Sequence, residues 1–472
     1  MTSRDTRSFV VIATVVSGGI IAYQVAGKAT RDALFLSSFA VTVLPSMVIG
    51  SATLSVLAVL LASRLLAARD PTKVIPEVLG LSGLLLLVEW GLVGYFRQGI
   101  AIAVYLHFSA LGALLISGFW SIVSERFDPR SAKKQIGRIA AGGTVGGVLG
   151  GVLAERVGAS LSVTAMLPLL AGIQFGCAWV LSAVQPVATL APVSAGAGAS
   201  PDGSVKPRSG LRLLSETPYL MNLVGLVLLT TVSEGLIDYV FKANAVAGYG
   251  RGEDLIRLFA AYYTGVALLT FLVQTTLSRR ALETLGLAKT VGTLPAVVAA
   301  GGAGSLLFPG LASALLARGG EAVCRSSLYR SAYELLFTPI PAREKRATKA
   351  LVDVGIVRLG DVLGAGVVQA ALLLGPVRVN PLLLILTIGL ALAAMVVARR
   401  LHAGYVHTLE KSLLSRAVAL DVADVEDSTT RTAFLHTTGA LGLSRLEFAA
   451  ALAEGQAAPR SEERRVGKEC RL

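Results

Sequence analysis

The sequence predicts an all-α membrane protein with twelve transmembrane helices, and three observations lead to this fold class. Hydrophobic residues make up 54% of the 472 residues and charged residues only 15%, and the mean hydropathy is +0.68. A water-soluble chain of this length carries more charge on its surface. The apolar residues come in blocks of about 20, the length of helix that crosses a hydrocarbon core. Lysine and arginine gather in alternate connections between the blocks, as in multi-pass membrane proteins.

Each apolar block is expected to be a helix, because a helix satisfies its own backbone hydrogen bonds inside lipid. The short segments of alternating polarity that typify transmembrane barrels do not occur in the sequence. The predicted spans are residues 9–27, 39–62, 74–94, 100–123, 136–155, 161–183, 218–240, 256–277, 287–308, 311–337, 349–374 and 379–400.

The positive charges predict the orientation, because cytoplasmic connections are richer in lysine and arginine. The even-numbered connections carry basic clusters, for example Lys133 and Lys134 after span four. The odd-numbered connections carry mostly single arginines, such as Arg97 and Arg156. We therefore expect a protein of the cell inner membrane with both termini in the cytoplasm. The net charge of +13 follows largely from this bias, so it does not indicate binding of nucleic acid.

A change of composition divides the chain. Residues 184–215 are rich in Pro, Ala, Gly and Ser, which is typical of a flexible linker. Six spans precede the linker and six follow it, so residues 1–183 and 216–401 are predicted to be two six-helix halves. A weak repeat supports this division, since residues 129–134 after span four resemble residues 341–346 after span ten. Two parallel halves joined by a cytoplasmic linker are typical of major-facilitator transporters.

The residues after the last span need separate treatment. Residues 402–459 are predicted to be a cytoplasmic tail, which we expect to be cut short. Residues 460–470 read RSEERRVGKEC, the translation of a common sequencing-library adapter, so we expect residues 460–472 to be an artefact. The other two cysteines, Cys177 and Cys324, lie inside predicted spans and offer neither a disulfide framework nor a metal-binding spacing.

Span five is rich in glycine, with pairs of glycines that recur every four residues from Gly142 to Gly151. A phosphate-binding loop needs a strand before the glycines, and here they lie inside an apolar helix. At this spacing glycines form a bare helix face, against which a second helix packs closely. The sequence contains no Walker A motif, nucleophile–base set or metal-ligand spacing, so we expect neither an ATP-driven pump nor an enzyme.

Charged residues inside the predicted spans are the strongest functional signal. A charge at the bilayer centre costs at least about 2.5–3.5 kcal/mol, so it usually faces a cavity or a charged partner. Lys242 and Glu334 lie near span ends and are interpreted as structural pairs or as side chains that reach the interface. The others are expected to line a cavity where cations bind an anionic substrate and acids balance the empty site. These candidate substrate-binding residues are Lys28, Arg31, Asp32, Asp238, Arg318, Glu321, Arg325, Asp353, Arg358 and Asp361.

Several short motifs, taken in order along the chain, resemble the ATP/ADP antiporter family of nucleotide transporters, especially its bacterial relatives. The resemblance covers nearly all of residues 9–415. It implies a major-facilitator-like fold and exchange of adenine nucleotides, with Arg31 and Asp32 matching the family's basic–acidic pair after span one. The matching stretches are residues 31–36 (RDALFL), 118–120 (GFW), 127–130 (FDPR), 237–242 (IDYVFK), 334–336 (ELL), 349–353 (KALVD) and 358–361 (RLGD).

The chain departs from the family in span four. Nucleotide-exchanging members are expected to have an acidic residue there, about eleven residues before the Phe119–Trp120 pair, where this chain has His107 and Phe108. Three functions therefore stay open: a nucleotide antiporter, a major-facilitator transporter of another organic or phosphorylated anion, and a non-transporting membrane anchor for a cytoplasmic repeat domain. We expect no cofactor, metal or obligate protein partner. The expected partners are the lipid bilayer and a nucleotide or other anionic small molecule.

Overall fold

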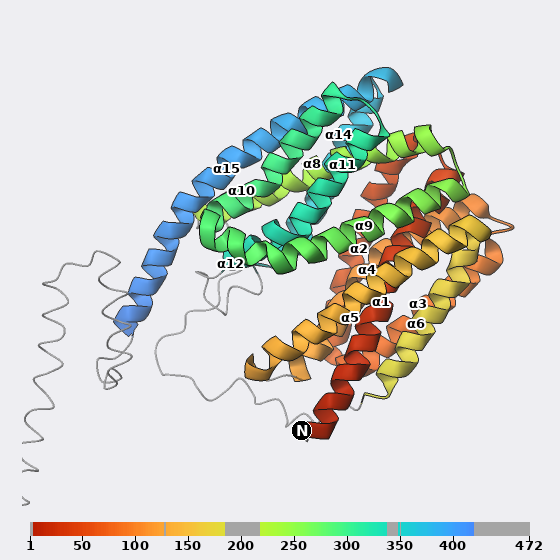
Figure 1. Ribbon diagram of the computed structural model, residues 1–472, viewed down its shortest axis with the longest axis horizontal. Helices are drawn as coiled ribbons and strands as arrows, with labels where there is room; N and C mark the ends of the chain where they lie inside the picture. The colour runs from red at the N-terminus through yellow and green to blue at the C-terminus, as the bar shows by residue number, and fades with distance from the viewer. Residues whose placement is uncertain (1–2, 127–128, 185–217, 338–347, 350, 420–472) are drawn as a thin grey trace, which may run out of the picture.

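The computed structural model describes residues 3–126, 129–184, 218–337, 348–349 and 351–419. These residues form helices and contain no strand. Figure 1 shows two groups of helices, one in red to yellow at the lower right and one in green to blue at the upper left. We call α1–α6 the first half and α8–α15 the second half.

The first half consists of long helices joined by short connections. Asp70 caps α3, because its side chain accepts a hydrogen bond from the Thr72 N–H at 2.8 Å. Short 3-10 turns, η1 and η2, lead into α2 and α6. The elements are α1 (Ser3–Ser38), η1 (Val41–Val43), α2 (Leu44–Ala68), α3 (Pro71–Leu92), α4 (Arg97–Arg126), α5 (Pro129–Ser160), η2 (Val163–Ala165) and α6 (Met166–Ser182).

The second half is less regular. Its helix α10 is kinked at Gly286, whose φ of 76° only glycine adopts without strain. Two π-helical turns, η3 and η4, interrupt the charged helices. The elements are α8 (Pro218–Tyr249), α9 (Glu253–Thr276), α10 (Ser278–Leu307), α11 (Leu311–Cys324), η3 (Arg325–Tyr329), α12 (Arg330–Leu335), η4 (Leu351–Ile356), α14 (Val357–Leu372) and α15 (Pro376–Ala419).

A described helix overlaps each predicted span, and within the described residues nine helices are long and apolar enough to cross a membrane. Spans five, ten and eleven are not among these nine. Span five is the glycine-rich α5, and the π turns divide spans ten and eleven into shorter helices. The predicted tail begins inside α15, which runs on to Ala419. Most of the predicted linker, the repeat at 341–346 and the expected artefact at 460–472 lie outside the described residues.

The predicted end of span one at residue 27 is wrong, because α1 continues to Ser38. A single glycine at Gly27 does not stop the helix, since the residues that follow it bury an apolar face. Ala33, Leu34 and Phe35 are fully buried. As a result Lys28, Arg31 and Asp32 lie within a continuous helix rather than in a connection after it.

The glycine face of α5 packs against α1, as the four-residue spacing predicts. A Cβ atom added at Gly146 would lie 1.9 Å from the Gly18 carbonyl oxygen, and one at Gly150 would lie 2.4 Å from that of Ala22. No side chain fits at these distances, so the two backbones touch directly. This contact fixes the position of α1, which carries three of the candidate site residues.

Within the described residues, the two halves share a hydrophobic core at one end. One core cluster combines Phe35 and Leu36 of α1 with Phe241 of α8 and Phe259 of α9. A second cluster belongs to the second half alone and includes Tyr219 and Phe337. At the shared end, the Gly252 N–H donates to Ser37 Oγ at 3.0 Å and joins the two halves. The halves are therefore closed against each other where α1 ends and α9 begins.

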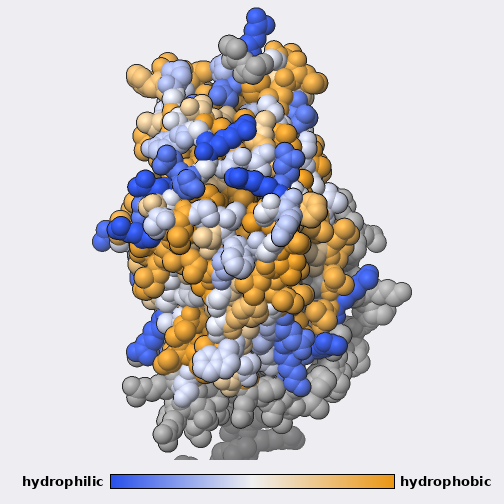
Figure 2. Space-filling model, turned by 90° about the vertical axis from the view of Figure 1, so that its right-hand side faces the viewer, coloured by the Kyte–Doolittle hydropathy of each residue, from blue (hydrophilic) through white to orange (hydrophobic). Residues whose placement is uncertain are grey.

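The outer surface is largely apolar. Many large hydrophobic side chains are exposed, for example Leu61, Trp179 and Leu316 at 69%, 78% and 72%. Figure 2 shows broad apolar areas on the viewed face, with hydrophilic residues gathered in a few places. Exposed apolar area on this scale is typical of a surface covered by lipid.

Candidate functional site

A cavity of about 460 Å³ lies between the two halves. Helices α1, α2 and α4 line it from the first half, and α8, α9, α11 and α14 from the second. A second compartment of about 540 Å³ adjoins it. The two share Gln24, Lys28, Ile116 and Tyr263 in their walls. Compartments of this size accept a small organic molecule.

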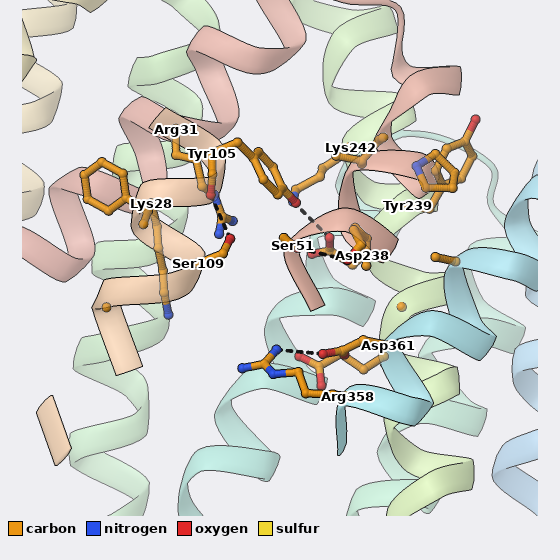
Figure 3. Close-up of a pocket in the computed structure, with 18 of the residues that line it drawn as sticks. Lys28, Arg31, Ser51, Tyr105, Ser109, Asp238, Tyr239, Lys242, Arg358 and Asp361 are labelled. Atoms are coloured by element: carbon orange, nitrogen blue, oxygen red, sulfur yellow. Dashed lines mark hydrogen bonds and ion pairs between the residues drawn. The ribbon is translucent and has the colours of Figure 1, made fainter. Parts of the chain in front are cut away.

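Lys28 differs from the other cations of this cavity in its surroundings. Its side chain is exposed to the cavity and borders both compartments. Within the described part of the chain it has neither an ion-pair partner nor a hydrogen bond. Figure 3 shows the Lys28 amine pointing into the open space, whereas dashed lines join Lys242 to Asp238 and Arg358 to Asp361.

Two arginines of the second half hold an acidic cluster together. Arg318 pairs with Asp238 at 2.9 Å and with Glu234 at 3.2 Å, and it also contacts Glu321. Arg325 pairs with Glu321 at 2.5 Å and with Glu234 at 3.1 Å. Glu321 is fully buried behind the cavity wall. Each of these three carboxylates thus has two cationic neighbours, which offset the cost of removing its charge from water.

A second group of charges crosses from one half to the other. Lys242 of α8 lies 3.3 Å from Asp32 of α1 and 3.0 Å from Asp238. The Tyr263 hydroxyl of α9 donates to Asp32 at 2.6 Å. Asp32 also pairs with Arg31 at 2.8 Å within α1. Asp32 therefore ties the first half to two helices of the second half.

The interpretation of Lys242 as a side chain that reaches the interface is wrong. Lys242 is 3% exposed, because α8 extends past the predicted span end to Tyr249 and keeps this residue inside the bundle. Glu334, treated in the same way, is 40% exposed and pairs with Lys349 at 2.6 Å. That pair lies at the surface, in keeping with the structural interpretation.

The remaining candidates divide between the cavity and its surroundings. Arg358 and Asp361 line the cavity from α14 and pair with each other at 2.7 Å. Arg31 lines it from α1, with its guanidinium 4.6 Å from the centre of the Tyr105 ring. Asp353 lies in η4, where it accepts a hydrogen bond from Tyr333 and does not border the cavity.

The charges in and around the cavity nearly cancel. Six cations face five carboxylates, which leaves a formal charge of +1 within the described residues. The cations are Lys28, Arg31, Lys242, Arg318, Arg325 and Arg358, and the carboxylates are Asp32, Glu234, Asp238, Glu321 and Asp361.

The adjoining compartment has a different character. Phe119 and Trp120 of α4 line it, together with hydroxyl and amide side chains such as Thr144 and Gln274. Aromatic faces bind flat apolar groups, and the amides and hydroxyls supply hydrogen bonds. Lys28 stands where the aromatic compartment meets the charged one, so one ligand can reach both.

The π turns coincide with the charged part of the second half. η3 begins at Arg325, and η4 contains Asp353. A π turn adds a residue to a helical turn, and such turns are frequent at functional sites. Arg318 and Arg325 both contact Glu321, at the i,i+3 and i,i+4 spacings of a regular helix, and η3 begins directly after this contact.

The list of candidates inferred from the sequence omits several residues that the structure places in the site. Glu234 and Lys242 share the i, i+4, i+8 spacing with Asp238, and this spacing was the available signal. Tyr105 and Tyr263 carry no such signal, because nothing in the sequence shows that they face Arg31 and Asp32.

Comparison with solved structures identifies the fold. No family model matches the chain, and no curated protein matches its sequence. The structure is similar to that of the nucleoside transporter NupG, with a TM-score of 0.57 and 12% identity over 83% of this chain and 99% of that one. It is also similar to the POT family transporter PepTSo, with a TM-score of 0.58 and 12% identity over 86% and 99%.

A bacterial homolog to the human lysosomal transporter Spinster, solved in an inward-facing and unoccupied conformation, has a TM-score of 0.50 and 14% identity over 88% of this chain and 98% of that one. The chain thus has the major-facilitator-like fold of these proteins. Together with its long apolar helices, this fold makes it a multi-pass membrane protein.

Proposed function

We propose that this protein is a secondary transporter that exchanges anionic small molecules of the nucleotide class across the inner membrane. The observation that carries the proposal is Lys28, a cation without an ionic partner among the described residues that faces the cavity between the two halves. An ammonium group in such a place is costly unless a ligand supplies the negative charge.

The two compartments suggest how a nucleotide binds. Its phosphates occupy the charged compartment, next to Lys28 and within reach of Arg31 and Arg318. Its base and sugar lie against Phe119 and Trp120 in the adjoining compartment. The phosphates offer several oxygens and can replace carboxylates as partners of the guanidinium groups. The paired acids keep the empty site close to neutral and are displaced when the anion arrives.

We further propose twelve crossings with both termini in the cytoplasm, on the basis of the lysine and arginine distribution. The shared core then lies at the outer face, and the protein is closed to the outside and open to the cytoplasm. Opening the outside requires the contacts of Asp32 with Lys242 and Tyr263 to break. Alternating exposure of a central site is the general mechanism of this fold.

A second candidate is transport of a singly charged organic anion. The formal charge of +1 at the site favours it, because one negative charge neutralises the site without any exchange of partners. A polyphosphate needs the arginines to leave their carboxylates. The substrate assay below separates these two possibilities.

The test uses purified protein in proteoliposomes, with uptake of labelled ATP measured with ADP inside or absent. Inorganic phosphate, lactate and a neutral sugar are tested in parallel. We expect uptake of ATP that depends on internal ADP and is lost in Lys28→Gln. Loss of one hydrogen bond to a charged group corresponds to about 1.5–3 kcal/mol, or roughly a 10–150-fold weaker affinity.

The matched control is Arg69→Gln, because Arg69 is 64% exposed and pairs only loosely with Glu77 at 3.7 Å. This variant should transport like the parent. Uptake of lactate alone would favour the second candidate. Absence of uptake and of ligand-induced thermal stabilisation with every anion would reject transport and favour the anchor for a cytoplasmic domain.

A further inference from the structure

A second polar network lies inside the first half, separate from the cavity. Glu89 of α3 contacts His107 Nδ1 of α4 through both carboxylate oxygens, at 3.0 and 3.2 Å. His107 Nε2 lies 2.9 Å from Ser82 Oγ of α3. Gln174 of α6 donates to the same Ser82 Oγ at 3.1 Å. The four side chains form an unbroken chain of hydrogen bonds across three helices.

This network is buried in the apolar interior. The side chains of His107 and Glu89 are 4% and 9% exposed, and Ser82 and Gln174 are fully buried. Glu89 is seven residues beyond Ser82 in α3, so the network extends about 10 Å along the helix axis. It starts near the end of α3 at Leu92 and reaches the middle of the helix. None of its members borders the substrate cavity.

The surroundings contain few other ionisable groups. α1 contributes Tyr23, whose hydroxyl lies near Ser82, Gln174 and Glu89. α6 contributes Cys177, and α2 has no ionisable side chain between Leu44 and residue 63. The nearest cations of α1, Lys28 and Arg31, line the cavity instead. The charge of the network is therefore set by Glu89 and His107.

With a neutral imidazole, every hydrogen bond of the network has a clear direction. His107 Nδ1–H donates to the Glu89 carboxylate, and Ser82 donates to His107 Nε2 while it accepts from Gln174. This arrangement leaves one buried negative charge in the first half. A buried carboxylate without a cation is unfavourable, and a proton on His107 would supply that cation.

Two buried oxygen atoms can accept the hydrogen bond that Ser82 donates once His107 is protonated. When His107 gains a proton, its Nε2–H donates to Ser82, and the Ser82 hydroxyl must then donate elsewhere. Tyr23 Oη and Gln174 Oε1 are buried, and both belong to side chains next to Ser82, so either oxygen can accept a hydrogen bond from the Ser82 hydroxyl.

We propose that the Glu89–His107 pair is a proton-binding site that couples substrate transport to the proton gradient. One proton from solution binds to His107, and the resulting imidazolium forms an ion pair with the Glu89 carboxylate. The proton returns to solution when a change of conformation exposes the pair to water. The site lies between α3, which supplies Glu89, and α4, which supplies His107.

The helices of the network also carry the substrate site. Phe108, next to His107, stacks on Tyr23 at 4.9 Å and lines the cavity. Tyr23 precedes Gln24, which donates to the Gly112 carbonyl of α4 at 3.0 Å and borders both compartments. A change of hydrogen bonding at Ser82 and Tyr23 therefore acts on the α1–α4 contact that positions Lys28. This coupling rests on the proposed transport function, but proton binding itself does not.

The first experiment needs no substrate. The chain has four histidines, so His402→Gln, His407→Gln and His436→Gln leave His107 as the single one. Nitrogen-15 NMR of labelled histidine in lipid then reports the charge of His107 between about pH 5 and pH 8. We expect one change from neutral imidazole to imidazolium. In Glu89→Gln, we expect the imidazolium signal to be lost from this range, because its counterion is gone. An imidazole that keeps one state throughout would overturn the proposal.

The second experiment measures coupling to conformation. Spin labels replace Arg97 and Arg251, which are exposed on the two halves at the closed end, in a variant in which the three cysteines of the chain are replaced by serine. The distance distribution between them should change between about pH 5.5 and pH 8 in the parent and stay constant in His107→Gln. An equal change in both proteins, or no change in the parent, would overturn the coupling. If the protein shows both pH responses but does not transport nucleotides, the proposed substrate class is rejected and the proton-binding site is not.

Discussion

The contact of Asp32 with Lys242 and Tyr263 should hold the two halves closed at this end, which is the outer end in the proposed orientation, and Asp32→Asn tests this. Asparagine has the shape of aspartate but no charge, so the substitution removes the attraction to Lys242 without creating a cavity. Its amide oxygen still accepts a hydrogen bond from Tyr263. Of the contacts that join the two halves, the substitution therefore removes only the ion pair between Asp32 and Lys242.

The structure sets the magnitude. Two unit charges at 3.3 Å attract each other by about 5 kcal/mol at an effective dielectric constant of about 20. Lys242 keeps Asp238 at 3.0 Å as a second partner, and desolvation of the pair offsets part of the attraction. A net loss of about 1.5–3 kcal/mol is reasonable for a hydrogen bond to a charged group. If the contact exists only in the closed state, the open fraction rises about tenfold or more.

The assay is labelling of a cysteine inside the cavity from the outside. Ser51 is 8% exposed and lines the cavity from α2, so Ser51→Cys reports opening with little disturbance. A membrane-impermeant thiol reagent is added to right-side-out vesicles. Labelling should be fastest in Asp32→Asn, intermediate in Tyr263→Phe and unchanged in Arg69→Gln. Equal rates in all four proteins would refute the assignment of this contact as the outer closure.

Three further predictions concern packing, the charge cluster and topology. Gly146→Ala should lower the melting temperature, because its Cβ would lie 1.9 Å from the Gly18 oxygen, whereas Gly172→Ala, with open space around it, should be neutral or slightly stabilising; equal melting temperatures would contradict close packing. Glu321→Gln and Arg325→Gln should each lower the free energy of unfolding by about 3–5 kcal/mol, because each single change leaves a buried charge without its partner. The double variant should lose much less than the sum of the two single losses. Losses that simply add in thermal denaturation would contradict the pairing. Cysteines at positions 97 and 131 should be labelled from opposite sides of the membrane, and labelling of both from outside would refute the topology.

The helices were predictable because their signal is local. About twenty apolar residues in a row specify a span whatever lies next to them, and a described helix overlaps each of the predicted blocks. The ends were less predictable. Nothing local shows that α1 passes through Gly27 to Ser38, because this depends on the burial of Leu34 and Phe35 against the second half.

The candidate site was predictable to the extent that charge inside an apolar span is a signal by itself. This rule found Lys28, Arg31 and Arg318, which line the cavity. It does not tell which charges meet. Asp353 and Asp361 share the same sequence signal, yet of these two only Asp361 borders the cavity, whereas Asp353 lies in η4 and accepts a hydrogen bond from Tyr333. Glu89 also lies inside a predicted span, 74–94, and was missed although the same rule applies to it; only its contact with His107 on another helix could not be read from the sequence.

A nearly neutral site suits a protein that must open on alternate sides. If the cations were unpaired, the empty protein would carry several unbalanced charges through the apolar bundle during each return, at a high cost in free energy. If all were paired equally well, no substrate could compete. Among the described residues the carboxylates balance five of the six cations, and Lys28 is left to make the first contact with an anion. An anion that binds Lys28 can then displace Asp238 from Arg318, and Asp238 in turn strengthens its hold on Lys242 at the expense of Asp32. Substrate binding would thereby weaken the contact that keeps the outer end closed.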